Sequence, residues 1–262
     1  APVVVTATAV PFKPSGTLNI SVPNMGNENW IFRNAGGVDA RVMWSHLSDP
    51  LWGIDRVKGS TEFSADMGIM DTWDFNITPT EYTATIVIKK GIPFHNDEGV
   101  VTAEDLKFTY TAYLEEGSIS SDANTKKTFL DNNANNVTVI DDKTVKFNLA
   151  RNFGFEFTLR QHLGEFEGVF SKAYMERGGE DGFQDHPIGT GPFRFIEHKS
   201  DQKVTLEAVL GHWRQTPAYD RLIINKVPDA ATRLAQLLSG QAAIVDVSPQ
   251  QMSQVIRNSD TR

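Results

Sequence analysis

The last third of the sequence alternates helix signals with strand signals, and this alternation constrains the fold more than any other feature. Asp229 follows Pro228 and is a residue type that caps helices, and the apolar periodicity after it stops at Gly240. Residues 244–247 then form a short apolar run typical of a buried strand. A second helix start follows, with cap, first-turn proline and reciprocal glutamine at Ser248, Pro249 and Gln251. Strands and helices in this alternation predict α/β layers.

The middle of the chain, residues 57–170, is richer in alternating strands and polar turns. Residues 82–89 and 144–149 alternate apolar and polar side chains, as antiparallel strands with one solvated face do. Between them, Thr102 is predicted to cap a helix, with Asp105 as its capping-box partner. One buried stripe on this helix consists of Leu106, Tyr110, Tyr113 and Leu114. The segment is therefore predicted to be an α+β unit.

These patterns divide the chain into two interleaved subdomains. Residues 1–56 and 171–262 are predicted to form an α/β lobe, whose first strand covers residues 18–22. Residues 57–170 are predicted to form an inserted α+β subdomain. Residues 1–14 are small, β-branched and proline-containing without a helical period, so we expect a tether there.

Composition excludes several function classes. The chain has 262 residues, of which 40% are apolar, enough for a sizeable core. Its net charge of -8 opposes binding to nucleic acid or anionic lipid. The absence of cysteine excludes disulfides and thiol chemistry. No apolar run is long enough for a membrane span, and no signal peptide is visible, so we expect a soluble and already processed chain.

Two short motifs suggest chemistry but have simpler structural interpretations. His95, Asp97 and Glu98 are metal-ligating residue types, but such close spacing suits a turn better than a tetrahedral site. The Gly189–Pro192 run resembles a phosphate cradle but lacks the following Lys-Ser/Thr, and Pro192 has no amide donor. It predicts a sharp loop before a strand over residues 193–196. We expect Gly189 and Gly191 at positions where a side chain would crowd this loop, at least one of them with a positive φ. No Gly-x-Ser-x-Gly elbow occurs, so no enzyme, cofactor or metal site is predicted.

Three tryptophans, Trp30, Trp44 and Trp52, lie in one early segment. A flat apolar ring with one hydrogen-bond donor is suited to lining a solute cleft. Large aromatic rings are equally suited to a core. Both interpretations stand for these residues.

Three further motifs carry a resemblance to a known family. Residues 89–96, KKGIPFHN, followed by TAEDL at 102–106, resemble the "R/K-x-G-V-x-F-H-D-G…T-A-E-D-V" signature of family 5 solute-binding proteins. Residues 187–193, PIGTGPF, are similar to the family's "P-x-G-T-G-P-Y/F". Residues 227–234, VPDAATRL, with SGQ at 239–241, resemble its "I-P-D-A-A-T-R-L…S-G-E". These motifs occur in the family's order over most of the chain.

The early part of the chain departs from the family pattern. Asp49-Pro50-Leu51 and Asp55 resemble the family's "Y-E-P-L…D", but Ser48 stands where an aromatic residue is common. The usual "L-D-P" after the first strand is missing. We expect the cleft wall to come from the loop after the first strand and from the segment around Asp49. The predicted solute-binding residues are Asn29, Trp30, Trp44, Asp49 and Trp52.

The resemblance implies a fold and a function. The fold is a type II periplasmic-binding-protein-like lobe, with a mixed sheet flanked by helices and an inserted α+β subdomain; the second lobe is expected to be absent from this chain. The function is capture of oligopeptides or a similar small polar solute by lobe closure, without catalysis or cofactor, for delivery to an ABC permease. The protein is expected to be a monomer at the periplasmic or extracellular face of the cytoplasmic membrane, with a lipid anchor on a removed N-terminal segment. Alternatives on the same fold are a solute sensor or interaction module and, further off, a metal-dependent enzyme.

Overall fold

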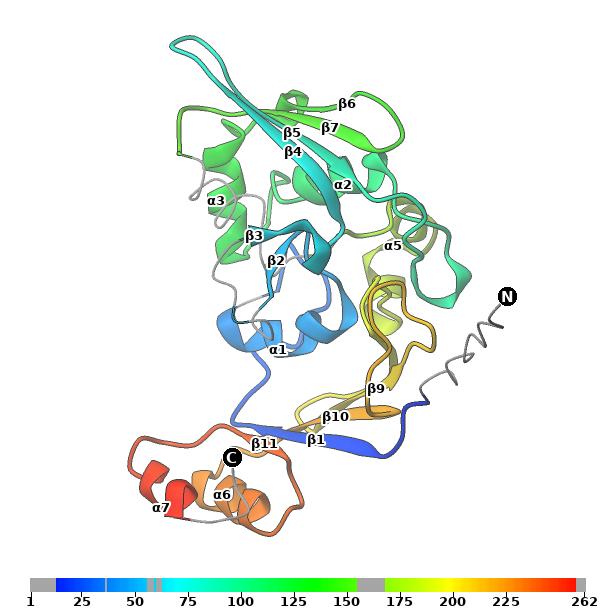
Figure 1. The fold of residues 1–262 in the computed structure, drawn as a ribbon. Coiled ribbons are helices and arrows are strands. Elements are labelled where there is room, and N and C mark those ends of the chain that lie inside the picture. The colour runs from blue at the N-terminus through cyan, green and yellow to red at the C-terminus, as the bar shows by residue number, and fades with distance from the viewer. Residues whose placement is uncertain (1–12, 36, 56–58, 60–62, 155–167, 258–262) are drawn as a thin grey trace, which may run out of the picture.

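A mixed five-stranded sheet forms one end of the molecule in the computed structural model, which describes residues 13–35, 37–55, 59, 63–154 and 168–257 (Figure 1). In sheet order its strands are β11 (Ile244–Val245), β1 (Thr17–Val22), β10 (Arg221–Lys226), β9 (Lys203–Ala208) and β8 (Phe193–Lys199). β1 runs parallel to both β10 and β11, whereas β10, β9 and β8 pair antiparallel. The predicted strands at 18–22 and 193–196 are confirmed within a longer β1 and β8.

A four-stranded antiparallel sheet forms the other end (Figure 1). Its strands in order are β4 (Met70–Ile77), β5 (Tyr82–Ile88), β7 (Thr144–Asn148) and β6 (Val137–Val139). The helix α2 (Ala103–Ala112) packs on β6 and β7, and α3 (Ser121–Phe129) follows it in the chain. Val145 and Phe147 are fully buried beneath α2, and the predicted strands at 82–89 and 144–149 are confirmed to within a residue.

Helices and loops between the two sheets carry much of the core. The helices α1 (Gly37–Leu47) and α5 (Lys172–Asp185) lie in this middle region in Figure 1. Phe32 and Phe170 stack there with ring centroids 3.8 Å apart, and Trp44 meets Phe170 edge-on at 5.0 Å. The remaining short elements are β2 (Gly53–Ile54), β3 (Phe63–Ser64), η1 (Ala65–Met67), η2 (His95–Asp97) and η3 (Ala134–Asn136). None of the helices in the described ranges is long and apolar enough to cross a membrane.

The two sheets come from different parts of the sequence. The four-stranded sheet uses residues 70–148, and the five-stranded sheet uses residues 17–22 together with residues 193–245. The division into 1–56 with 171–262 and an insertion of 57–170 stays a prediction. Its first boundary and most of the 1–14 tether lie outside the described residues.

The C-terminal βαβ segment follows the predicted alternation with two corrections. Asp229 caps α6 (Ala230–Leu238), and its Oδ1 accepts from the Thr232 amide at 2.7 Å. The predicted buried strand at 244–247 is wrong in burial, because β11 is a two-residue edge strand whose Ile244 is 52% exposed. The Ser248 amide donates to the Gln251 side chain as expected, but a turn intervenes, and α7 (Met252–Arg257) begins later.

Thr102 caps α2 through the predicted capping box. The Asp105 amide donates to the Thr102 hydroxyl at 3.4 Å, and the Asp105 carboxylate accepts from the Thr102 amide at 2.9 Å. We expect Thr102→Ala to lower the free energy of unfolding by about 1 kcal/mol, because the Asp105 amide loses the hydroxyl that accepts its hydrogen bond. Urea denaturation measures this. Thr111→Ala, inside the same helix, is the control and should be near neutral because alanine favours helices; equal effects of both changes would contradict the capping role.

Candidate functional site

The loop after β1 holds the first two predicted solute-binding residues. The Asn29 side chain accepts a hydrogen bond from the Ile31 amide at 2.8 Å, which closes a local turn. The Trp30 amide donates to Gln184 Oε1 of α5 at 2.7 Å. The loop is thus fixed at both residues, and their contact with a solute stays a prediction.

All three candidate tryptophans are buried. Trp30 and Trp52 have no exposed surface, and Trp44 is 8% exposed. The Trp30 ring meets Trp44 and Phe195 edge-on, with centroids 5.6 and 5.5 Å apart. This placement favours the core-packing interpretation of the rings over direct solute contact. The indole N–H groups of Trp30 and Trp44 are buried and have no hydrogen-bond partner within the described part of the chain, which is an uncommon state for such donors.

Asp49 lies at the centre of a buried polar cluster. It follows α1 and has no exposed surface. Its carboxylate accepts from Arg214 Nη2 at 2.7 Å, from Trp213 Nε1 at 2.8 Å and from His212 Nε2 at 3.0 Å. Its amide donates to the Thr190 hydroxyl at 3.1 Å. We call these five residues the Asp49 cluster; it connects the end of α1 to the Gly-Thr-Gly loop and to the loop between β9 and β10.

The hydrogen bonds of the cluster define its protonation. His212 Nδ1 accepts from the amides of Arg214 and Gln215, so Nε2 carries the hydrogen that His212 donates to Asp49 and to the Thr190 carbonyl. Burial raises the pKa of Asp49, but the hydrogen bonds from His212 and Arg214 and the positive charge of Arg214 outweigh it, and the pKa is lowered overall. Asp49 is therefore an ionised, fully paired buried carboxylate at neutral pH.

His95 joins the two glycine-containing motifs. Its Nδ1 accepts from the Gly189 amide at 3.2 Å, and its Nε2 donates to the Gly191 carbonyl at 2.8 Å. Burial lowers the pKa of His95 to about 4 despite the bond to Gly191, so the ring is neutral at neutral pH. With Asn96 and Asp97 it forms the short turn η2, which confirms the turn interpretation. No group of three His, Asp or Glu residues in the described ranges is arranged to hold a metal ion.

The Gly-Thr-Gly loop presses against the end of α1. A Cβ on Gly189 would lie 2.2 Å from the Leu47 carbonyl oxygen, and one on Gly191 would lie 2.5 Å from the Leu47 carbonyl carbon. The expected crowding is confirmed. The expected left-handed backbone is wrong, because neither glycine has a positive φ. Close approach of two backbones, and not turn conformation, explains the glycines.

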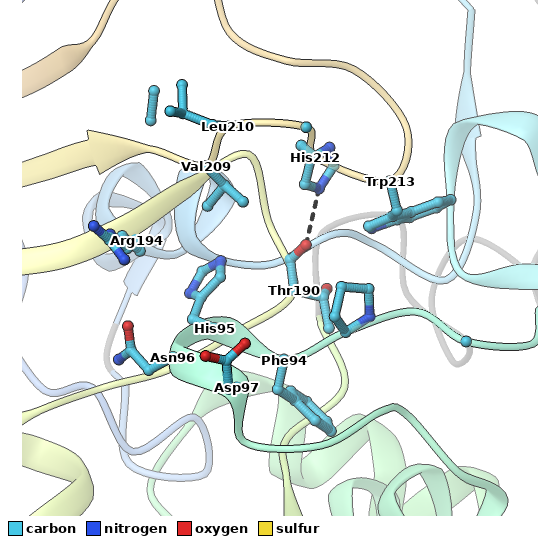
Figure 2. Close-up of a pocket in the computed structure, with 14 residues that line it drawn as sticks. Phe94, His95, Asn96, Asp97, Thr190, Arg194, Val209, Leu210, His212 and Trp213 are labelled. Atoms are coloured by element: carbon cyan, nitrogen blue, oxygen red, sulfur yellow. Dashed lines mark hydrogen bonds between the residues drawn. The ribbon is translucent and has the colours of Figure 1, made fainter.

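A cavity of about 560 Å³ opens beside the Asp49 cluster (Figure 2). One wall is the loop at 91–97, and the other is the loop at 208–213, with Thr190 and Arg194 between them. His95 and His212 lie at its inner side, and both histidines use both ring nitrogens for internal hydrogen bonds. Of the predicted solute-binding residues, none lines this cavity.

A second feature is the shared carboxyl edge of three parallel strands. β10, β1 and β11 lie side by side in the same direction, so the loops that begin at residues 23, 227 and 246 leave the same edge. Arg233 of α6 ties two of these loops together, donating to the carbonyls of Val227 and Asp246 at 2.8 Å. Open α/β sheets bind ligands at this kind of edge.

A family model described as bacterial extracellular solute-binding proteins, family 5 Middle, matches residues 69–262, more than half of the chain. The chain belongs to family 5 of these solute-binding proteins. This membership confirms the resemblance of the three sequence motifs. Two of these motifs meet in the structure, because His95 of η2 bonds Gly189 and Gly191 of the Gly-Thr-Gly loop.

Individual relatives agree with the family. The chain is 26% identical over 209 residues to heme-binding protein A of Haemophilus influenzae, covering 73% of this chain and 37% of the relative. It is 25% identical over 194 residues to the dipeptide-binding protein of Escherichia coli, covering 68% and 35%. The structure of the periplasmic binding protein DppA from Helicobacter pylori, in complex with peptide STSA, superposes with a TM-score of 0.73 at 22% identity, covering 93% and 49%. The periplasmic-binding-protein fold is therefore confirmed. This family 5 chain spans about a third of the length of the two curated relatives and about half of the length of the solved chain.

Sequence reasoning missed three members of the Asp49 cluster. His212, Trp213 and Arg214 lie more than 160 residues from Asp49 along the chain. Their only local signal is three consecutive hydrogen-bonding side chains in a loop between β9 and β10. In this family 5 chain, a buried carboxylate after α1 requires such partners, but sequence alone does not say which residues supply them.

Proposed function

We propose that this chain forms one lobe of the extracytoplasmic substrate-binding component of an ABC importer. The solute is an oligopeptide or a similar small polar molecule, which the protein holds by closure of two lobes and passes to a membrane permease without chemical change. It works as a monomer, in the periplasm or at the outer face of the cytoplasmic membrane. Family membership supports the class, and the names of relatives that bind dipeptide or heme support a small solute.

The observation that carries this proposal is the common carboxyl edge of β10, β1 and β11 within a family 5 fold. Asn29 and Trp30 belong to the loop that leaves β1 at that edge, which is why we assign the cleft wall to this region together with Trp44, Asp49 and Trp52. Because the tryptophans and Asp49 are buried, their contribution is to hold the wall in place. The groups left for a solute are then the loop backbones and side chains that keep some exposed surface, such as the half-buried Asn24.

The two-lobe arrangement makes this chain a poor binder by itself. A binding site buries most of a small ligand's surface, and a single wall leaves the opposite face of the solute in water. Isothermal calorimetry of the 262-residue chain against a library of di- to pentapeptides should give dissociation constants weaker than about 100 μM. Binding at about 1 μM or tighter by this chain alone would contradict closure by two lobes.

The class of solute needs a separate measurement. The protein carrying both lobes should release a small molecule on denaturation, and mass spectrometry identifies it. Peptides or another small polar compound in stoichiometric amount would support capture. Turnover of that compound on incubation with the native protein would instead show an enzyme.

A further inference from the structure

The cavity beside the Asp49 cluster is separate from the proposed cleft. Its lining comes from residues 91–97 and 208–213 with Thr190 and Arg194, and none of these belongs to the carboxyl-edge loops (Figure 2). Its volume of about 560 Å³ falls in the range of small-molecule sites, which is about 300–1,000 Å³. The Asp49 cluster and His95 fix both walls from behind.

One part of the lining is apolar and accessible. Leu210 is 72% exposed, Pro93 is exposed, and Trp213 is half-buried. The Trp213 ring is held in place because its Nε1 donates to Asp49 at 2.8 Å. A rigid aromatic ring and two further apolar side chains in the same lining offer apolar surface to a flat apolar body.

The other part of the lining carries an exposed carboxyl group that has no partner among the residues that the structure describes. Asn96 and Asp97 are both exposed, both have φ near 60°, and their side chains make no hydrogen bond or ion pair with any residue in the described ranges. Two consecutive residues in this sparsely populated conformation hold an amide and a carboxyl group in the cavity lining (Figure 2).

The neighbouring charges are already engaged. Arg194 donates through Nε and Nη2 to Glu207 at 3.0 and 2.5 Å, and Lys89, 5.5 Å from the Trp213 ring centre, donates to the carbonyls of Ala65 and Gly68. His95 and His212 have no free ring nitrogen. Asp97 is therefore the lining charge available to a ligand among the residues that the structure describes.

We propose that this cavity is a second ligand site, which takes a small organic cation with a flat apolar body. The cationic nitrogen pairs with Asp97 and the Asn96 side-chain oxygen, and the apolar body lies against Leu210, Pro93 and Trp213. The chain's net charge of -8 raises the local concentration of such cations. For a ligand of eight heavy atoms on an open surface, a dissociation constant on the order of 1 mM is expected.

Three probes of one shape separate the charge from the apolar contact. Benzylamine, benzyl alcohol and benzoate are titrated into the 262-residue chain, and backbone amide shifts at 91–97 and 208–213 are followed by NMR. Benzylamine should bind about fivefold more tightly than benzyl alcohol, the factor expected for one partly exposed ion pair. Benzoate should bind more weakly than either. Tighter binding of benzoate would assign the site to Arg194 and overturn the proposal, as would the absence of shifts for all three.

Matched variants test whether the Asp97 carboxyl group is the partner of the cation. Asp97→Asn removes the carboxylate, and asparagine tolerates the same φ, so the turn should persist and benzylamine should bind like benzyl alcohol. Asp131→Asn is the control, because Asp131 is also exposed with a φ of 52° but lies in the loop after α3. Leu210→Ser should weaken all three probes by a similar factor. Unchanged benzylamine binding in Asp97→Asn, or an equal loss in Asp131→Asn, would overturn the site.

Discussion

Asp49→Ala is expected to lower the free energy of unfolding by about 3–5 kcal/mol, the range for breaking one side of a buried ion pair. The change removes the acceptor of the half-buried Arg214 and Trp213 donors, and it leaves the buried His212 only the Thr190 carbonyl to donate to. An unmade buried hydrogen bond costs more than a made one contributes, because the donor has already given up its water. Urea denaturation followed by far-UV circular dichroism measures the loss.

Two further variants test whether the charge or the shape matters. Asp49→Asn keeps the shape and one acceptor oxygen, so its loss should be smaller than that of Asp49→Ala but still exceed about 1 kcal/mol. Glu81→Ala removes an ion pair with Lys146 in which both side chains are well exposed, and its cost should stay below about 1 kcal/mol. A loss for Asp49→Ala no larger than that for Glu81→Ala would contradict the central role of the cluster.

The same cluster gives a pH dependence with a defined sign. Because the folded-state pKa of Asp49 is lowered from its usual 3.8, its charge contributes stability that is present above that value and is lost as pH falls through the folded pKa. The stability difference between the native chain and Asp49→Ala should therefore be constant around neutral pH. It should shrink in acid, below about pH 4.

Elements with local signals were predictable from sequence, and contacts between distant segments were not. Thr102 and Asp229 cap helices because the side chain and its target amide are three residues apart, a pattern visible in any window of the chain. The partners of Asp49 come from a loop more than 160 residues away, which no periodicity or cap identifies. Trp30 shows the same limit, since core and cleft require the same residue type and only its packing against Phe195 separates them.

The Gly-Thr-Gly loop shows how a correct expectation can rest on an incorrect reason. The sequence predicts crowding at both glycines and a positive φ at one or more of them, and only the crowding is present. A glycine in sequence signals that a side chain is excluded, but it does not say whether dihedral angles or a neighbouring backbone excludes it. The contact of residues 189–191 with the end of α1 supplies the physical cause here.

Gly191→Val is expected to abolish the cooperative folding of the chain. The Gly191 amide donates to the Leu47 carbonyl at 2.8 Å, so the loop and the end of α1 are joined backbone to backbone. An added Cβ would lie 2.5 Å from the Leu47 carbonyl carbon, 2.6 Å from the Ser48 nitrogen and 2.7 Å from the His46 oxygen. All three neighbours are main-chain atoms, so no side-chain rotation relieves the overlap, and the loop must separate from α1.

Separation of the loop from α1 also affects the residues on either side. Thr190 and His95 would lose their positions, because the first bonds Asp49 and the second bonds Gly189 and Gly191. Even Gly191→Ala, which adds one methyl group, should therefore cost about 3 kcal/mol or more, at the upper end of the range for overpacking. Gly178→Ala is the matched control: Gly178 lies in α5 with nothing within 4 Å of the added Cβ, so the change should stabilise by about 0.5–1 kcal/mol. If thermal unfolding of Gly191→Ala stays cooperative with a midpoint close to that of the native chain, the close backbone contact does not explain the glycine at this position.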